Sequence, residues 1–340
     1  VAALSAAQIG ALSATNVSAL DGTQVAALTT TQVKGLTADQ IKGLSTTDVS
    51  ELANTQISAL TADQLKNLSA TNLSALDATQ TAALTVTQMK GLTNTQLAGL
   101  STTDISDLAD TQISALSSAQ ITALNVQDLT TTQISRLSST VIGAIGPTKF
   151  SAWNATQVSA LNATQLKGLT TSQLASLTTT DIGELADTQV AALTASQLGA
   201  LSATGFSALD ATQVAALSST QIKGLTATQL KGLTTTDIGQ LADTQVAALA
   251  ATQIGALTAT GLSALDATQT AALSTTQIKG LTADQLKGLT TTDIGELTTT
   301  QVAALATTQL SALSATSISL DEEDDVERGF LLVLLDGESI

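Results

Sequence analysis

The sequence predicts an all-α solenoid of very short helices, with one helix in each eight-residue repeat. An octad of the form Leu-[Ser/Thr]-x-[Thr/Asp]-[Gln/Asp]-[Ile/Val/Leu]-x-[Ala/Gly] starts at Leu4 and continues almost to the C-terminus. Between Leu4 and Leu313, 40 units begin, and 38 of them begin with Leu; the exceptions are Ile145 and Trp153. Such dense repetition is typical of one stacked array and not of a set of globular domains.

Each octad contains signals that start a short helix and anchor it. In the octad LTADQIKG, Thr37 and Gln40 have the spacing of a capping box, in which each side chain bonds the backbone N–H of the other residue. Leu36 and Ile41 have the spacing of a hydrophobic staple, and Gly43 stands where helices often end. Several octads carry Asp in place of Gln, which keeps negative charge in the first turn: Asp48, Asp104, Asp181, Asp237 and Asp293.

The length of the repeat excludes one long helix. Eight residues at about 100° each advance the Leu position by about 80° per octad, so no apolar stripe persists. A β-solenoid is the alternative, because Thr, Ile and Val are abundant. However, apolar positions one and six of the octad have opposite parity and do not share one face of a strand. We therefore expect stacked short helices, with positions one and six facing inward.

The composition excludes several classes of function. The chain has no Cys, His or Tyr, so the usual soft-metal sites and nucleophile–base pairs cannot form. We expect no enzymatic activity, no cofactor and no bound transition metal. The formal net charge is -16, which disfavours nucleic acid as a partner because phosphate neutralisation needs clustered Lys and Arg. No run of apolar residues is long enough to span a membrane.

The repeats divide the chain into four segments. A five-residue unit, Leu124–Asp128, interrupts the octads, and the repeats that follow are the least regular. Pro147 restricts the backbone there, and Trp153 is expected to fill a Leu position of the core. We predict an octad array, irregular repeats with a possible kink, a second array, and an acidic and then apolar tail, at residues 1–124, 125–153, 154–316 and 317–340.

A longer period of seven octads is superimposed on the single octads. It separates Leu20 from Leu76 and Leu209 from Leu265, and the same step separates Asp48 from Asp104. Recent tandem duplication accounts for this period without giving it structural meaning. Alternatively, seven octads correspond to one superhelical turn, which would place equivalent charges above one another.

The repeat resembles a known class of bacterial repeats. In forms such as LTTTQISRL at residues 129–137, it runs through about residues 1–316. It is similar to the degenerate octapeptide repeats of large secreted or surface bacterial proteins, which are often adhesin- or haemagglutinin-like. The resemblance implies an extracellular or cell-surface location in a bacterium, with a structural or adhesive role.

Two functions follow as hypotheses. The first is a structural subunit of an extracellular filament or sheath that assembles head-to-tail with copies of itself. The second is the stalk or binding module of a large secreted adhesin that contacts a cell surface, and ice binding by the hydroxyl-rich positions is a third. For assembly, we expect an uncapped, exposed apolar end at the first octads to receive an apolar tail segment. The expected assembly residues are Leu4, Ile9, Phe330, Leu331, Leu332, Val333, Leu334 and Leu335.

Overall fold

The computed structural model describes residues 1–313, and these residues form a solenoid of short helices. Within them, 38 α-helices of four to six residues and one 3-10 helix follow one another, and no β-strand is present. The predicted all-α solenoid is therefore confirmed over residues 1–313, and the alternative β-solenoid is wrong there. Contacts divide the described chain into two compact units, one of residues 1–169 and one that begins at residue 170.

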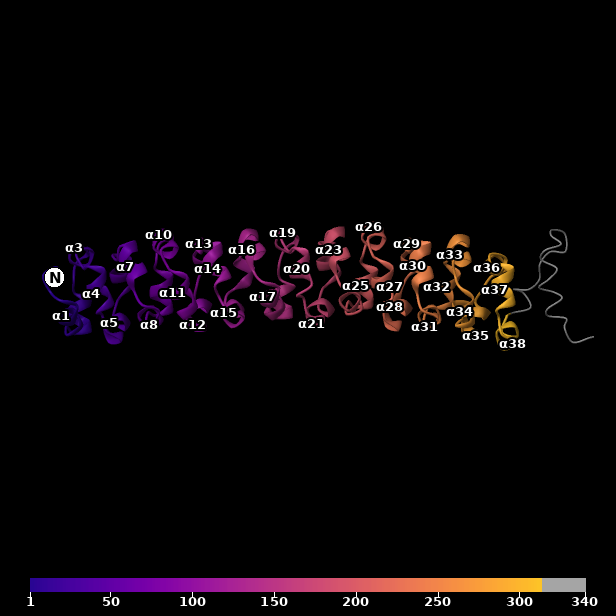
Figure 1. Cartoon of the computed structure of the whole chain (residues 1–340), viewed down its shortest axis with the longest axis horizontal. Helices are drawn as coiled ribbons and strands as arrows, with labels where there is room; N and C mark the ends of the chain where they lie inside the picture. The colour runs from indigo at the N-terminus through magenta and orange to yellow at the C-terminus, as the bar shows by residue number, and fades with distance from the viewer. Residues whose placement is uncertain (314–340) are drawn as a thin grey trace, which may run out of the picture. The chain divides into compact units, whose positions relative to one another are not determined.

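The first unit contains α1 to α20, coloured indigo to magenta in Figure 1. Their bounds are α1 Ala6–Gly10, α2 Ala14–Ser18, α3 Gly22–Ala26, α4 Thr30–Lys34, α5 Ala38–Lys42, α6 Thr46–Ser50, α7 Asn54–Ala59, α8 Ala62–Lys66, α9 Ala70–Ser74, α10 Ala78–Ala82, α11 Val86–Gly91, α12 Asn94–Ala98, α13 Thr102–Asp107, α14 Asp110–Ser114, α15 Ser118–Ala123, η1 Val126–Asp128, α16 Thr131–Arg136, α17 Ser139–Ala144, α18 Pro147–Phe150, α19 Ala155–Ser159 and α20 Ala163–Leu166.

The described part of the second unit contains α21 to α38, which continue in the magenta-to-yellow part of Figure 1. Their bounds are α21 Thr171–Ala175, α22 Thr179–Gly183, α23 Asp187–Ala192, α24 Ala195–Leu198, α25 Ala203–Ser207, α26 Ala211–Ala215, α27 Ser219–Ile222, α28 Ala227–Gly232, α29 Thr235–Gln240, α30 Asp243–Ala248, α31 Ala251–Ile254, α32 Ala259–Ser263, α33 Ala267–Ala271, α34 Thr275–Lys279, α35 Ala283–Lys287, α36 Thr291–Gly295, α37 Thr299–Ala303 and α38 Thr307–Leu310.

The helices begin where the capping signals predict. At α5, the hydroxyl of Thr37 accepts from the N–H of Gln40, while the side-chain oxygen of Gln40 accepts from the N–H of Thr37 at 2.8 Å. Where Ala stands at the cap position, only the Gln half of this exchange is possible; the N–H of Ala53 donates to Gln56 at 2.8 Å. The capping box is therefore the general start signal of the array, and either half can start a helix alone, as the hydroxyl of Ser202 does where Gly205 replaces Gln.

Positions one and six of the octad form the core, as the staple spacing predicts. At α5, Ile41 is fully buried and Leu36 is only 6% exposed. The same two positions are buried in the octad of α28, where Leu225 and Leu230 are 4% and 1% exposed, and Leu233, which begins the next octad, is 7% exposed. Because a lone octad contributes only these two large apolar side chains, each helix needs the neighbouring helices to cover them.

Helices three places apart in the chain stack on one another. Within the first unit, α1 contacts α4, α5 contacts α8, and α8 contacts α11. The view in Figure 1 agrees: α3, α7, α10 and α13 lie along one edge of this unit, and α5, α8, α12 and α15 along the opposite edge. Side chains also bond residues four octads earlier, as described below. One turn of the solenoid, here called a coil, therefore contains between three and four octads.

This coil size corrects one hypothesis for the seven-octad period. Seven octads span one coil of three and one of four, so the period corresponds to about two coils and not to one. Equivalent octads therefore return to the same side of a unit every second coil.

Where position eight is Gly, the residue is required by packing and not by a left-handed helix end. Gly43 has a φ of -81°, a value open to any residue. A Cβ at Gly43 would lie 2.9 Å from the Cβ of Ala14, and one at Gly91 would lie 2.8 Å from the Cβ of Ala62. The end of one helix thus contacts the beginning of the helix three places earlier, and a larger side chain at either place would separate the two coils.

The irregular repeats lie inside the first unit. The five-residue unit folds as η1, and Pro147 is the first residue of α18, where its missing N–H is not needed. Trp153 is 3% exposed and occupies the Leu position of its octad, as expected. Its ring centroid lies 5.3 Å from that of Phe150. The predicted kink at 125–153 stays a prediction, as do the predicted segment boundaries.

We predict that Leu233→Asp destabilises the protein far more than Thr234→Ser. The Asp side chain would place an unpaired charge among buried apolar side chains, at a cost of several kcal/mol. Ser at position 234 keeps the oxygen that accepts from the N–H of Asp237. Thermal unfolding followed by circular dichroism measures both variants, and equal midpoints would contradict the assignment of Leu233 to the core.

Candidate functional site

The Gln at position five joins one coil to the coil before it. At Gln40, the side-chain Nε2 donates to the carbonyl of Ile9 and to the carbonyl of Leu12, both at 2.8 Å. These two carbonyls lie at the end of α1, where helix carbonyls lack partners within their own helix. One side chain therefore satisfies the start of its own helix through Oε1 and the end of a helix in the previous coil through Nε2.

The same bridge recurs in both units. Gln88 donates to the carbonyls of Ile57 and Leu60 at 2.7 and 2.9 Å. In the second unit, Gln245 donates to those of Val214 and Leu217, both at 2.8 Å. The acceptors lie 31 and 28 residues before the Gln in each regular case. Further Gln residues that donate in this way are Gln56, Gln64, Gln80, Gln96, Gln112, Gln120, Gln165, Gln213, Gln221, Gln229, Gln269, Gln277, Gln285, Gln301 and Gln309.

Sequence reasoning identified the capping role of Gln and missed the bridge. A capping box accepts either Glu or Gln at its third helical position. No octad carries Glu at position five, although Gln occupies most of them. Only Gln supplies an N–H₂ group, so this exclusion of Glu was a readable signal that the side chain must also donate.

Where Asp replaces Gln, a serine in the previous coil supplies the donor. Asp293 accepts from the N–H of Thr290 at 2.7 Å and from the hydroxyl of Ser263 at 2.6 Å. Asp cannot donate to carbonyls, so the direction of the contact between coils is reversed. The same pairing joins Ser18 to Asp48, Ser74 to Asp104 and Ser207 to Asp237, with 30 residues between partners.

These pairs explain part of the seven-octad period. Ser18 and Asp48 are each followed seven octads later by the next pair, Ser74 and Asp104. A change of Gln to Asp in one octad requires a hydroxyl donor four octads earlier, so the two octads have to vary together. The period therefore has structural meaning at these positions, whatever duplication produced it.

The bridge is maintained across the five-residue unit by other donors. Lys149 occupies position five of its octad, and its Nζ donates to the carbonyls of Thr122 and Leu124 at 2.6 and 3.0 Å. The indole Nε1 of Trp153 donates to the carbonyl of Val126 at 2.9 Å. These residues replace the Gln amide where the shortened unit changes the register between coils.

Each coil consequently has a donor face and an acceptor face. Gln side chains extend toward the coil with lower residue numbers, and the carbonyls that receive them face the coil with higher numbers. In the first coil, Gln8 and Gln24 are exposed, and their side-chain oxygens accept only within their own helices, at 2.8 and 3.1 Å. Within residues 1–313, the side-chain nitrogens of these two Gln residues donate to no carbonyl of another coil.

The residues expected to take part in assembly have different surroundings. Leu4 is half-buried, so part of its side chain is accessible at the first coil. Ile9 is fully buried, because α4 packs against α1, and the expectation that it is exposed is wrong. The tail segment Phe330–Leu335 lies outside the described residues.

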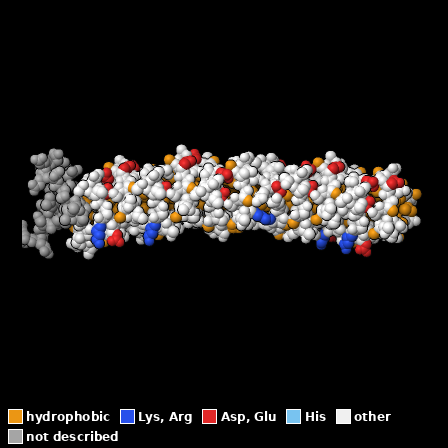
Figure 2. Space-filling view, turned by 180° about the vertical axis from the view of Figure 1, so that it is seen from behind, with side chains coloured by type: hydrophobic (Ala, Val, Ile, Leu, Met, Phe, Trp, Pro, Cys, Tyr) orange, Lys and Arg blue, Asp and Glu red, His pale blue; other side chains and the backbone are white. Residues whose placement is uncertain are grey.

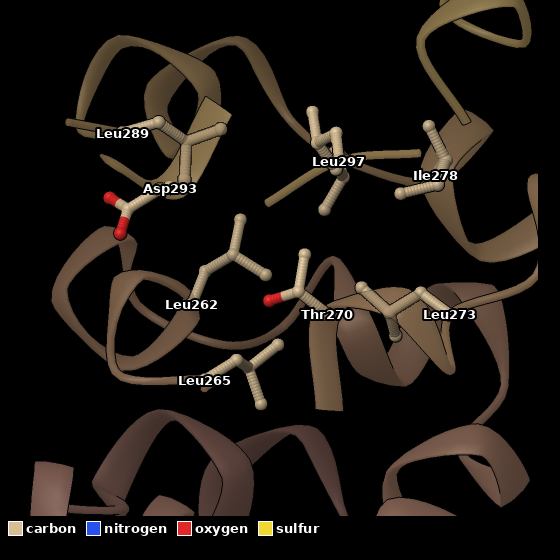
Figure 3. A pocket seen from close by; sticks show the side chains of 9 residues that line it. Leu262, Leu265, Thr270, Leu273, Ile278, Leu289, Asp293 and Leu297 are labelled. Carbon is tan, nitrogen blue, oxygen red and sulfur yellow. The ribbon is translucent and has the colours of Figure 1, made fainter. Parts of the chain in front are cut away.

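Small cavities occur where Thr replaces the apolar residue at position six. In the second unit, Thr270 lies beside a cavity of about 20 Å³. Figure 3 shows Leu262, Leu265 and Leu273 around it, with Leu297 opposite. A corresponding cavity of about 10 Å³ lies next to Thr81 in the first unit. The larger of the two has room for about one water molecule and not for an organic ligand.

No group of His, Cys, Asp and Glu within residues 1–313 could hold a metal ion. Over the same part of the chain, no helix has the length and apolar character needed to cross a membrane. The chain matches no model of a known protein family and no curated protein sequence.

We predict that Gln88→Glu lowers the free energy of unfolding by about 2 kcal/mol or more. Glu keeps an oxygen for the N–H of Thr85 but loses both bonds to the previous coil and brings an anion to two carbonyls. The matched control is Gln24→Glu. Gln24 makes no bond to another coil, so this substitution should change the free energy of unfolding by less than about 0.5 kcal/mol. Denaturant unfolding compares them, and equal losses would show that the bridge does not stabilise the fold.

Lowering the pH should destabilise the protein by protonating three aspartates that cap helices. Hydrogen bonds from the hydroxyl of Thr79 and the N–H of Gln80 lower the pKa of Asp77 below its usual 3.8, and Asp210 and Asp266 are lowered in the same way. A lowered pKa in the folded state gives stability that is present above pH 3.8 and lost as the pH falls through the folded value.

We therefore predict that the triple variant Asp77→Asn, Asp210→Asn, Asp266→Asn loses less stability than the wild type between about pH 5 and pH 2. Asn remains a good cap but does not titrate. Thermal midpoints across this range provide the measurement. The control carries the same change at the exposed Asp39, Asp63 and Asp284, which cap no helix. If both triple variants flatten the profile equally, the caps are not responsible.

Proposed function

We propose that this protein is a structural subunit that assembles head-to-tail into an extracellular bacterial filament or sheath. The observation that supports the proposal is the pair of complementary faces on every coil. A donor face carries Gln amides and an acceptor face carries the terminal carbonyls of helices, as Gln40 with Ile9 and Leu12 illustrates. The contact that joins coils within a unit is therefore chemically able to join coils of different molecules.

The geometry of this contact favours an open assembly. The two faces are different surfaces, so a donor face binds an acceptor face and not another donor face. Such a heterologous contact continues indefinitely when its rotation does not close a ring. Repetition of the same coil also means that the contact between molecules needs no interface beyond the one already used inside each unit.

The first coil illustrates the donor side of the proposed contact. Gln8 and Gln24 are exposed and would reach the helix-end carbonyls of another coil. On the acceptor side, the carbonyls of Ile294 and Leu297 occupy the positions that receive a Gln amide elsewhere, and no Gln within residues 1–313 donates to them. The tail segment Phe330–Leu335 is proposed to assist this contact by covering apolar surface.

A structural role also agrees with the composition of the chain. With neither His nor Cys, the protein lacks the usual catalytic nucleophile–base pairs, and we propose that it is not an enzyme. The extracellular location rests on the resemblance of the octad to secreted and surface repeats. The stalk of an adhesin would use the same fold, but the cavities beside Thr81 and Thr270 offer no ligand site.

We predict that Gln8→Glu with Gln24→Glu shortens or abolishes filaments without lowering thermal stability. Each Glu keeps the capping acceptor of its own helix and loses the amide that would bond the next molecule. Negative-stain electron microscopy measures filament length, and circular dichroism measures the unfolding midpoint. The control, Asp39→Asn with Asp63→Asn, changes two exposed positions of neighbouring coils and should leave filament length unchanged.

Deletion of residues 320–340 tests the contribution of the tail. We expect the truncated protein to form shorter filaments than the full chain. If the full-length protein sediments only as a monomer at high concentration, head-to-tail assembly is wrong. If the truncated protein assembles like the full chain, the tail has no part in it.

A further inference from the structure

The exposed lysines of each unit gather along one edge. In the first unit, Lys42, Lys66 and Lys90 are carried by α5, α8 and α11, which stack directly on one another, and Lys34 lies on the adjacent α4. None of these four lysines forms an ion pair with any residue of the described chain. In the second unit, Lys223, Lys231, Lys279 and Lys287 are likewise exposed.

Most acidic residues of the first unit lie away from these lysines, although Asp39 and Asp63 share α5 and α8 with Lys42 and Lys66. Asp77 caps α10, and Asp104 and Asp107 lie on α13, which packs against α10. Asp110 begins the next helix, α14, which also contacts the lysine-bearing α11. Figure 2 shows the separation on the visible face of each unit: acidic side chains are concentrated toward one edge and basic ones toward the other, with single acidic residues among the lysines.

On the acidic edge, neighbouring carboxylates change the pKa of a glutamate. Burial raises the pKa of Glu296, and the nearby charges of Asp293 and Asp266 raise it further, against a hydrogen bond from Thr270. Among the described residues, no cation contributes to the pKa of Glu296. A cation supplied by another molecule would relieve this repulsion.

Both charged edges repeat with the same step. Lys34 and Lys90 are seven octads apart, and so are Lys223 and Lys279. The acidic pairs Glu51 and Asp107, and Asp187 and Asp243, have the same separation. Because this step corresponds to two coils in each unit, the lysines and the carboxylates that repeat do so with the same spacing.

We propose that the lysine edge of each unit binds the acidic edge of the same unit in a second copy of this chain. The partner is another copy because its acidic edge has the opposite charge and the same two-coil spacing. This contact is lateral and distinct from the end-to-end contact proposed above, so it widens an assembly without lengthening it. The ion pairs are exposed, and their strength should therefore depend strongly on salt.

The test compares assemblies of the full chain at about 10 mM and about 1 M NaCl, where the screening length is about 30 and about 3 Å. We expect bundles at low salt and thin assemblies or single molecules at high salt. Small-angle X-ray scattering gives the cross-sectional radius, and electron microscopy gives length and width separately. Loss of length with normal width would affect the end-to-end proposal alone. A cross-section that does not respond to salt would overturn the lateral proposal.

Charge-reversal variants identify the edges. Changing the eight edge lysines to Glu should weaken lateral association at low salt by about tenfold or more, since several exposed pairs are lost together. The eightfold Lys→Arg variant keeps the charges and should associate like the wild type. Circular dichroism checks that all variants keep the wild-type helical content.

A mixing experiment decides whether the partner is another copy. Asp107→Lys, Asp110→Lys, Asp187→Lys and Asp243→Lys make the acidic edge basic, and this variant should also fail to bundle. Mixed with the Lys→Glu variant, it should form bundles that contain both proteins, detectable by two fluorescent labels. If the mixture stays unbundled, or if the Lys→Glu variant bundles like the wild type, the proposal is wrong.

Discussion

The amide group of the Gln at position five is the interaction on which the rest of the structure depends. A helix of about five residues leaves most of its backbone N–H and C=O groups without partners inside the helix. In Gln40, one amide oxygen satisfies the start of its own helix, and the amide nitrogen satisfies the end of α1 one coil earlier. The short helices are thus stable only as members of an array, because each one is completed by a residue of the next coil.

This dependence fixes the length of the repeat and the way exceptions are accommodated. The acceptors lie 31 and 28 residues before the Gln, so a change in length within a coil displaces every bridge that spans it. After the five-residue unit, Gln133 still reaches two helix-end carbonyls, now 28 and 25 residues earlier. Lys149 and Trp153 then supply longer side chains until the regular spacing returns. Exchange of Gln for Asp similarly requires a serine in the preceding coil.

The sequence predicted those features that are determined within one octad. The helix starts, the staple and the burial of Leu36 and Ile41 depend on residues at most a few positions apart, and all were confirmed. The bridges between coils depend on the number of octads in one turn, which no single octad specifies. For the same reason Ile9 was expected to be exposed, although α4 covers it, and Gly43 was interpreted as a helix stop, although it is needed for contact with Ala14.

Some octad positions determine the fold, and others determine the chemistry of the surface. Positions one, five and six are occupied by core and bridge residues and vary little, whereas position eight alternates between small residues and charged ones such as Glu51 and Asp107. Lys42 and Asp39 stand at outward positions of the same octad, where neither is held by the core, and such positions are free to carry charge. Coil faces then interact through neutral amides and carbonyls, whereas unit edges interact through charges. Because salt screens charges far more than it weakens bonds between neutral groups, ionic strength acts on the proposed lateral contacts and largely spares the end-to-end contacts.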